Sequence, residues 1–530
     1  MLLHRKMESE IEEEGFEDWR GRRAIPGKHG GIRAAAIICV VEMLENMVFI
    51  TNANTLVSYF IKTMHYSAAK SATMMTNFLG TSFLLSLFGG FIADSFLTRF
   101  ASFIIFCLIE IMGLILLTIQ AQVTKLQPPP SETPSPRQEA VLFVGLYALG
   151  LGISGVKPAL PAHGGDQLDS RNKSLISAFF NWYFFSICIG GLVAVSVMVW
   201  IEENVGISWS FKISVVVLAL ALSVFVGGFP FYRYKRPGGS PLMRILKVIV
   251  SASRNRKGSL LDAGLKQNLN PENKSIHHNK FKCLDKALLD DEISATEVEE
   301  TRTFLSLLPI FASTIMMNCC LAQILTFSVQ QGAVMNRKLS PSFEIPVPSL
   351  TVIPVVFSLF SIPLYEFFHR RISGQNPAMD LFQPLKRIGL GLFLASISMA
   401  VAAFVEAKRR FEAVNHNVSI SVFYLAVQYL LLGVSDMCTL GGMLEFFYRE
   451  APERMRSISS SLSWCSNAMG FFLSTILVEL TNSITGAWFD GGAWLGGRDL
   501  NKARLDLFYA VLSVLNTLNL FNYIYWAKRY

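Results

Sequence analysis

The sequence predicts an all-α membrane protein that crosses the bilayer twelve times, and three observations lead to this prediction. The first is composition: 52% of the 530 residues are hydrophobic and 16% are charged, with a mean hydropathy of +0.41, whereas about a quarter of the residues in a soluble chain are charged. The second is a series of long apolar segments. The third is a polar stretch that divides this series into six segments on each side.

The apolar segments are long enough to form transmembrane helices. A helix needs about 20 residues to cross about 30 Å of hydrocarbon, and most of the segments approach or exceed this length. Because there are so many of them, the lipid bilayer is the expected surrounding of the chain. The helices are expected near 34–60, 71–96, 103–120, 140–160, 176–200, 215–231, 305–334, 353–368, 388–405, 422–447, 458–480 and 507–526.

The polar stretch predicts two six-helix bundles joined by a linker. Six plus six helices around a linker is the plan of the major facilitator superfamily, in which the substrate binds between two bundles near the middle of the membrane. This plan predicts transport by alternating access. We expect an N-terminal segment at 1–33, a first bundle at 34–231, a linker at 232–304, a second bundle at 305–527 and a C-terminal segment at 528–530.

The distribution of basic residues predicts the orientation. Twelve crossings put both termini on one side, and more of the 47 Lys and Arg residues lie on that side than on the other, even without the long linker. The positive-inside rule therefore predicts that both termini and the linker are cytoplasmic. This topology accounts for the net charge of +8, so no nucleic-acid partner is expected. The sequence leaves the oligomeric state open.

Ionisable residues inside the predicted helices are the candidate functional residues, because each costs at least roughly 2.5–3.5 kcal/mol in hydrocarbon unless it faces a partner or a wet cavity. Glu42 and Glu45 are three residues apart and share one face of the first helix. Repulsion between them favours a carboxyl that binds and releases a proton, as a proton-coupled carrier needs. The alternative is a structural pairing with a polar group nearby. Glu110, Asp436 and Glu479 are weaker candidates.

Lys157 is the only basic residue well inside a predicted helix, which makes it the candidate partner for an anion or a carboxylate. Its surroundings, 149–167, are rich in glycine and contain two prolines, so freed backbone groups there need a protein-lined cavity. Glu445 lies near the cytoplasmic end of the tenth helix. We expect a Lys157–Glu445 ion pair that joins the two halves and opens when the glutamate is protonated or an anion competes for the lysine; a static strut is the alternative.

The loop after the second helix reads GGFIADSFLTRF, at 89–100. It resembles the short signature of the major facilitator superfamily at this loop, in which an acidic and a basic residue bond across helix ends on the cytoplasmic face. Asp94 and Arg99 occupy those places. The resemblance implies a cytoplasmic gate that does not touch the substrate, and an ordinary capped turn is the alternative.

Five stretches resemble the plant nitrate transporter/peptide transporter family, the plant members of the proton-dependent oligopeptide transporters. The likeness covers nearly the whole chain. It is strongest toward the branch associated with import of abscisic acid, some relatives of which are linked to gibberellin or nitrate. The stretches are EMLEN at 42–46, GVKPALPAHGGDQLD at 155–169, FFNWYFFSICIGG at 179–191, CLAQILTFSVQQGAVMNR at 320–337 and EFFYREAPERMRS at 445–457.

The resemblance implies roles for the buried charges. Lys157 and Glu445 match the interhelical salt bridge of the family, and Glu42 and Glu45 match the two glutamates of its E-x-x-E-R proton-coupling motif. The fifth position of that motif departs, because Asn46 replaces the arginine or lysine of the family. Without a cation there to take the carboxylate of a peptide, transport of di- and tripeptides is not expected, and the number of coupled protons is left open.

Two further positions follow from the resemblance. Leu321 stands where a nitrate carrier of the family has a nitrate-binding histidine, and a leucine suits a substrate with a hydrocarbon body. Ser102 follows Arg99 at a position where relatives can be phosphorylated, which makes it a possible phosphosite.

The predicted function is that of a secondary transporter in the plasma membrane, which imports a small organic anion such as abscisic acid together with protons. Lys157 would attract the carboxylate, and Asn46, Gln323 and Gln330 would make neutral polar contacts, with core packing as the alternative for each glutamine. Nitrate or gibberellin transport, and a receptor that signals through the linker, are the alternatives. No cofactor other than protons, no metal and no catalytic residue is expected, since the chain has neither HExxH nor a GxSxG in a suitable setting.

Overall fold

The computed structural model describes residues 15–25, 27–66, 68–129, 132–237, 239–256, 281–290, 292–340, 343–345, 350–372, 383–488, 493–495 and 500–530. Parts of the predicted N-terminal segment and linker, 1–14 and 257–280, lie outside these residues. The described part is almost wholly helical, and its strands are short pairs: β1 (Phe16–Glu17) with β2 (Tyr234–Lys235), and β3 (Lys338–Ser340) with β4 (Phe343–Glu344).

The helices fall into two sets in chain order. The first half contains α2 (Gly31–Lys62), α3 (Ala68–Leu84), α4 (Ser86–Ser95), α5 (Arg99–Gln122), α6 (Pro136–Asp166), α7 (Lys173–Val193), α8 (Val199–Asn204) and α9 (Ile207–Gly227). The second half contains α12 (Ala295–Leu325), α13 (Phe327–Ala333), α14 (Val352–Ile372), α15 (Pro384–Phe411), α16 (Leu425–Glu450), α17 (Arg456–Trp488) and α18 (Leu505–Arg529).

These helices confirm the predicted fold class. Eleven helical stretches of the described chain are long and apolar enough to cross a membrane, and a shorter apolar helix, Val352–Phe367, lies at the predicted eighth position. Three stretches are interrupted: Leu85 separates α3 from α4, Thr326 separates α12 from α13, and a π-helical segment, Ala194–Met198, joins α7 to α8. By contrast, α6 continues as a helix through both Pro158 and Pro161.

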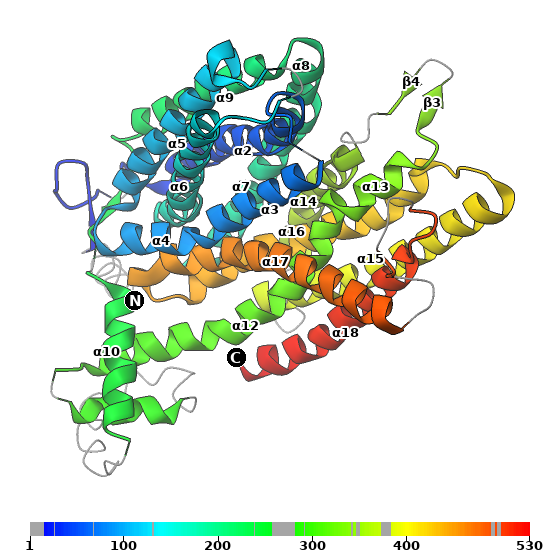
Figure 1. Cartoon of the computed structure of the whole chain (residues 1–530). Coiled ribbons are helices and arrows are strands. Elements are labelled where there is room, and N and C mark those ends of the chain that lie inside the picture. The colour runs from blue at the N-terminus through cyan, green and yellow to red at the C-terminus, as the bar shows by residue number, and fades with distance from the viewer. Residues whose placement is uncertain are drawn as a thin grey trace.

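Each half packs mainly within itself, and a few helices join the halves. In the first half α2 packs on α7 and α9, and α5 on α6; in the second half α15 packs on α16 and α18, and α12 on α17. Between the halves, α17 contacts α3 and α4, while α14 contacts α7. Figure 1 shows the first half in blue through cyan to bluish green and the second half in green to red, with α17 running along the contact.

The linker forms a small helical unit of its own. Here α10 (Pro241–Arg254) and the 3₁₀-helix η5 (Lys282–Leu289) pack against the first turns of α12. In Figure 1 this unit lies beyond one end of the long helices. We call this end, where α4, α6 and α16 end and α5, α12 and α17 begin, the linker end. The unit has a core of Val248, Ala252, Leu284, Ala287, Leu288, Ile293 and Val298.

The seventh apolar helix starts earlier than hydropathy indicated. Helix α12 begins at Ala295, inside the predicted linker, rather than near 305. Its first turn is fixed by a capping box in which Ser294 and Glu297 each hydrogen-bond the backbone N–H of the other. Because the first ten residues of α12 are mostly polar, a hydropathy profile detects only the apolar part of the helix.

Candidate functional site

Two buried polar clusters lie in the region where the predicted site residues gather. The first, the Lys157 cluster, consists of Glu42, Glu45, Asn46, Lys157 and Tyr183 and is contained in the first half. The second, the Asp166 cluster, lies at the linker end and joins both halves; it consists of Asp94, Arg99, Asp166, Tyr448 and Arg456.

In the Lys157 cluster, one ammonium group meets two carboxylates. The Lys157 Nζ lies 2.5 Å from an oxygen of Glu45 and 3.5 Å from one of Glu42, and it donates to the Asn46 side-chain oxygen at 3.2 Å. The Tyr183 hydroxyl donates to the other Glu42 oxygen at 2.5 Å. Glu42, Glu45 and Lys157 are fully buried. The two glutamates therefore share the face of α2 that meets α6, as their spacing predicts.

Asn46 fits this cluster without a charge. Its Oδ1 accepts from Lys157, and its Nδ2 donates to the Ile187 backbone carbonyl of α7 at 2.9 Å. A second cation at this position would face Lys157. The asparagine instead leaves the lysine as the single cation opposite two carboxyls.

Aromatic rings from both halves surround the lysine. The Lys157 Nζ lies 5.0 Å from the ring centroid of Phe49 on α2 and 5.1 Å from that of Trp464 on α17. Phe83 of α3 packs against both rings, with centroids 5.4 Å away in each case. The Trp464 Nε1 is buried and makes no hydrogen bond within the described residues. A cation, apolar rings and an unused N–H donor thus meet where the two halves join.

The predicted ion pair between Lys157 and Glu445 is wrong for this conformation. Lys157 lies nine residues before the end of α6, whereas Glu445 lies five residues before the end of α16. At 1.5 Å of rise per residue these positions correspond to depths of about 14 Å and about 8 Å from the linker end. Lys157 pairs instead with the carboxyls of α2.

Glu445 nevertheless joins the two halves through another residue. One of its oxygens accepts from the Ser177 hydroxyl of α7 at 3.0 Å, and the other accepts from Arg449 at 2.8 Å. The Arg387 guanidinium of α15 lies 3.9 Å from Glu445 and donates to Asn181 of α7 at 2.6 Å. Serine and asparagine side chains of α7 thus connect the first half to buried charges of the second.

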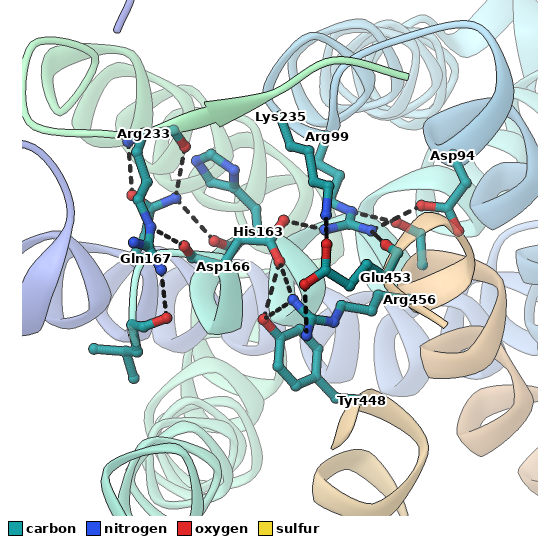
Figure 2. Close-up of polar contacts among 12 residues, drawn as sticks. Asp94, Arg99, His163, Asp166, Gln167, Arg233, Lys235, Tyr448, Glu453 and Arg456 are labelled. Atoms are coloured by element: carbon teal, nitrogen blue, oxygen red, sulfur yellow. Dashed lines mark hydrogen bonds and ion pairs between the residues drawn. The ribbon is translucent and has the colours of Figure 1, made fainter. Parts of the chain in front are cut away.

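The Asp166 cluster is organised around one carboxylate. Asp166, at the last position of α6, forms ion pairs with Arg99 of α5 and with Arg456 of α17, the latter at 3.2 Å. It also accepts from the Tyr448 hydroxyl of α16 at 2.9 Å. Figure 2 shows these side chains converging on Asp166 from both halves. Lys235 of β2 adds an ion pair to Glu453, at the start of the α17 region.

Asp94 and Arg99 meet, as the loop signature implies, and both also contact the second half. The Arg99 Nη2 donates to Asp94 at 3.0 Å, and its Nε donates to the Ser457 hydroxyl at 2.9 Å. The other Asp94 oxygen accepts from the backbone N–H of Ile458 at 2.9 Å. These bonds run from α4 and α5 to the first turn of α17, so they hold the linker end of the two halves together.

The paired glycines of the same signature permit this contact. A Cβ on Gly89 would overlap the backbone carbonyl of Ser154 on α6, and a Cβ on Gly90 would lie 2.8 Å from the Ser457 carbonyl of α17. Gly89 therefore allows α4 to approach within its own half, and Gly90 allows the approach to the second half.

The residues predicted in the seventh helix occupy different environments. Leu321 is half-buried against the hydrophobic core. Gln323 is fully buried, and its Nε2 donates to Cys319 and Ser474. Gln330 is exposed on α13.

Ser102 does not have the accessibility that a phosphosite needs. Its side chain is fully buried in the first turn of α5, and its hydroxyl makes no hydrogen bond within the described residues. A kinase could not reach the hydroxyl in this conformation, and the phosphosite stays a prediction. The Arg-x-x-Ser pattern carries no information on burial.

The sequence prediction missed several participants. Asp166 and Arg456 lie outside the predicted apolar segments, and Arg387 lies one residue before one, so a search inside the segments passed over them. Glu366, which accepts from Asn181 at 2.8 Å, lies within a predicted helix and could have been found by its charge. Tyr183 gave no signal, since tyrosines are common in membrane helices. No group of three or more His, Cys, Asp and Glu in the described chain is arranged to hold a metal ion.

Comparison with known proteins identifies the family of the chain. A family model described as the POT family matches residues 100–495. The chain belongs to the POT family. It is 63% identical to Protein NRT1/PTR FAMILY 4.2 of Arabidopsis thaliana over 99% of this chain and 100% of that protein, and 63% identical to Protein NRT1/PTR FAMILY 4.1 of the same plant with the same coverage.

Solved structures of the POT family share the fold. The crystal structure of an auto inhibited POT family peptide transporter matches with a TM-score of 0.65 at 19% identity, over 94% of this chain and 97% of that one. The POT family transporter PepTSo matches equally well, over 94% and 98%. This POT family chain is accordingly a multi-pass membrane protein and a proton-coupled secondary transporter of a small molecule, not an enzyme.

Proposed function

We propose that this POT family transporter imports a small organic anion with a hydrocarbon body, such as abscisic acid. The observation that carries the proposal is the position of Lys157, a buried ammonium beside the rings of Phe49 and Trp464. An incoming carboxylate would replace Glu45 as the partner of Lys157, and the hydrocarbon body would pack on the rings. The unused Trp464 N–H is a further donor for such a ligand.

Coupling to protons follows from the charges. When the carboxylate of the substrate pairs with the ammonium of Lys157, this cation no longer balances Glu42 and Glu45. The two glutamates are then neighbouring carboxylates in a buried site. Such a pair is stable only when protons neutralise it. Substrate and proton would thus enter together, and release of one would favour release of the other.

The choice among anions follows from the residues near the seventh helix. A half-buried Leu321 offers no polar group to an inorganic anion, so nitrate is disfavoured. Gibberellin carries a carboxylate on a hydrocarbon skeleton and is the second candidate on the same observation. Asn46, which already bonds Lys157, and Gln323, whose Oε1 makes no hydrogen bond within the described residues, are the neutral polar side chains that we propose for either molecule. The exposed position of Gln330 assigns it no contact.

The Asp166 cluster gives the proposed carrier its gate. We place the linker end in the cytoplasm, together with both termini, and the chain in the plasma membrane. Asp94 and Arg99 would then close the cytoplasmic side in this conformation, and alternating access would require the bonds from Arg99 and Asp166 to the second half to break.

Uptake into vesicles tests the proposal. Labelled abscisic acid, gibberellin and nitrate are supplied separately at an external pH of about 5.5 and of about 7.5, which bracket the range in which a buried carboxyl can titrate. We expect accumulation of abscisic acid, faster at the lower pH, and its loss in Lys157→Ala. Lys62→Ala, at the exposed end of α2, is the matched control and should transport normally.

Other outcomes select the alternatives. Binding of labelled abscisic acid without accumulation would indicate a receptor and overturn the transport assignment. Accumulation of nitrate alone would overturn the proposal that the substrate is an organic anion. Equal rates at both pH values would leave Glu42 and Glu45 with a structural role.

A further inference from the structure

Glu110 is a buried carboxyl that the proposed mechanism does not use. It lies in α5, is fully buried, and has no hydrogen-bond partner at either oxygen among the residues that the structure describes. The two carboxyls of the Lys157 cluster, by contrast, each have a donor: Tyr183 and Lys157 for Glu42, and Lys157 for Glu45. Glu110 is thus a third carboxyl without a donor of its own.

The packing places Glu110 directly against α6, the helix that carries Lys157. A Cβ added to Gly152 of α6 would overlap the backbone and Cβ of Glu110, so α5 and α6 are in direct contact at this level. Lys157 lies five residues further along α6. Glu45 and Lys157 are the charged groups that act electrostatically on Glu110, and no charged group of α4 or α9 does so in the described structure.

The protonation state follows from this geometry. An ionised carboxylate that is removed from water and receives no hydrogen bond costs far more than its neutral form, so such a group takes up a proton instead. The count of charges agrees, because Lys157 is the one cation of the described chain that faces Glu42, Glu45 and Glu110. One cation can balance one carboxylate, which leaves two of the three carboxyls to be neutralised by protons.

We infer that Glu110 is a further proton-binding site of the transport cycle, occupied in this conformation and emptied when the Lys157 cluster opens to water. In the release step the O–H bond of Glu110 breaks, the proton passes to water, and the remaining carboxylate is hydrated by the water that has entered the cluster. The site supplies a carboxyl in addition to the pair on α2, at a cluster where Asn46 adds no positive charge.

Infrared difference spectroscopy of the purified full chain tests the proton directly, without any substrate. At neutral pH the wild type is expected to show a carbonyl band of a protonated carboxylic acid that Glu110→Gln lacks. Glu479→Gln is the matched control, since Glu479 is an exposed glutamate in the membrane-spanning α17, and its spectrum should keep the band. A Glu110→Gln spectrum identical to that of the wild type in this region would overturn the inference.

Vesicle transport tests the coupling, and this part rests on the proposed function. With labelled abscisic acid as the probe, the ratio of protons to substrate from reversal potentials should fall by about one in Glu110→Gln, while exchange of substrate across the membrane continues. An unchanged ratio, or loss of exchange in a folded Glu110→Gln protein, would overturn the inference. If abscisic acid is not transported at all, the proposed substrate fails and the infrared result still decides on Glu110.

A second variant covers the case in which Glu110→Gln does not fold. Glu110→Asp keeps a titratable group in the same place and should show a shifted carboxylic acid band, because the shorter side chain changes the surroundings of the carbonyl. The absence of any shift in Glu110→Asp would exclude Glu110 as the source of the band.

Discussion

The Lys157 cluster and the Asp166 cluster are both buried, yet they differ in charge balance and in what they connect. Around Lys157, carboxyls outnumber cations, and the contacts with Glu42 and Glu45 lie within the first half. Around Asp166, two aspartates meet two arginines, and the ion pair with Arg456 crosses to the second half. A matched set of charges needs no proton and can serve as a lock, whereas an excess of carboxyls needs protons and can serve as a coupling site.

The largest effect is expected from Asp166→Asn, which removes the anion between Arg99 and Arg456. Breaking a buried ion pair costs about 3–5 kcal/mol, because uncompensated charges stay behind. The linker end should therefore open. Spin labels can be attached to Lys173→Cys and Arg454→Cys, two exposed positions in different halves, with the exposed native cysteine removed by Cys283→Ser. The distance between the two labels should be longer in Asp166→Asn than in the wild type.

The control for this experiment is Asp169→Asn, at an exposed aspartate three residues further on. Its distances should equal those of the wild type. If the Asp166 cluster needs no proton, opening by Asp166→Asn should be the same at acidic and at neutral pH. A strong pH dependence of the opening would remove the distinction between the two clusters.

A smaller effect is expected from Gly90→Ala, which adds a methyl group between α4 and the Ser457 carbonyl. Overpacking of this kind costs about 1–3 kcal/mol, so the closed linker end should be partly destabilised. The same pair of labels would show a mixture of short and long distances. Gly227→Ala, where an added Cβ meets nothing within 4 Å, should leave the distances unchanged. Identical distance distributions for Gly90→Ala and Gly227→Ala would show that close packing at Gly90 does not help to keep the linker end closed.

The smallest effect is expected from Tyr183→Phe, which removes the hydrogen bond to Glu42. A hydrogen bond contributes about 0.5–1.5 kcal/mol, equivalent to about one pH unit or less. The hydroxyl favours the ionised form of Glu42, so uptake should become half-maximal at a higher pH in the variant. Uptake of the labelled anion as a function of pH measures the change, with the exposed Tyr147→Phe as control. If the pH of half-maximal uptake changes in Tyr147→Phe, or does not change in Tyr183→Phe, the hydrogen bond to Glu42 does not set the pH dependence of uptake.

The fold was more predictable than the site. Long apolar segments identify membrane helices because the free energy of burying a helix in lipid is a sum over its own residues. The same method placed the start of α12 ten residues late, since its polar first turns extend beyond the apolar part. The contact between Asp94 and Arg99 was implied by the resemblance of their loop to the superfamily signature, in which an acidic and a basic residue bond across helix ends.

The partners of Lys157 and Glu445 show where sequence reasoning stops. Both residues were found as charges in apolar surroundings, but their pairing with each other was inferred from similar positions in two helices. In the structure a difference in depth of about 6 Å, from 1.5 Å of rise per residue, gives them different partners. Ion pairs depend on distances of that size, which follow from how the helices pack.

By itself, the sequence determined that this chain is an all-α membrane protein with two sets of helices, that Glu42 and Glu45 share a face, and that Lys157 is buried among apolar residues. Local properties decide all three: the hydropathy of a segment, the pitch of a helix and the type of a side chain. Only the tertiary structure decided that Lys157 binds Glu45, that Asp166 joins the halves and that Glu110 has no donor in the described part of the chain. Each of these depends on which helix lies against which, and contacts as close as Glu110 on Gly152 set the depth at which the charges meet.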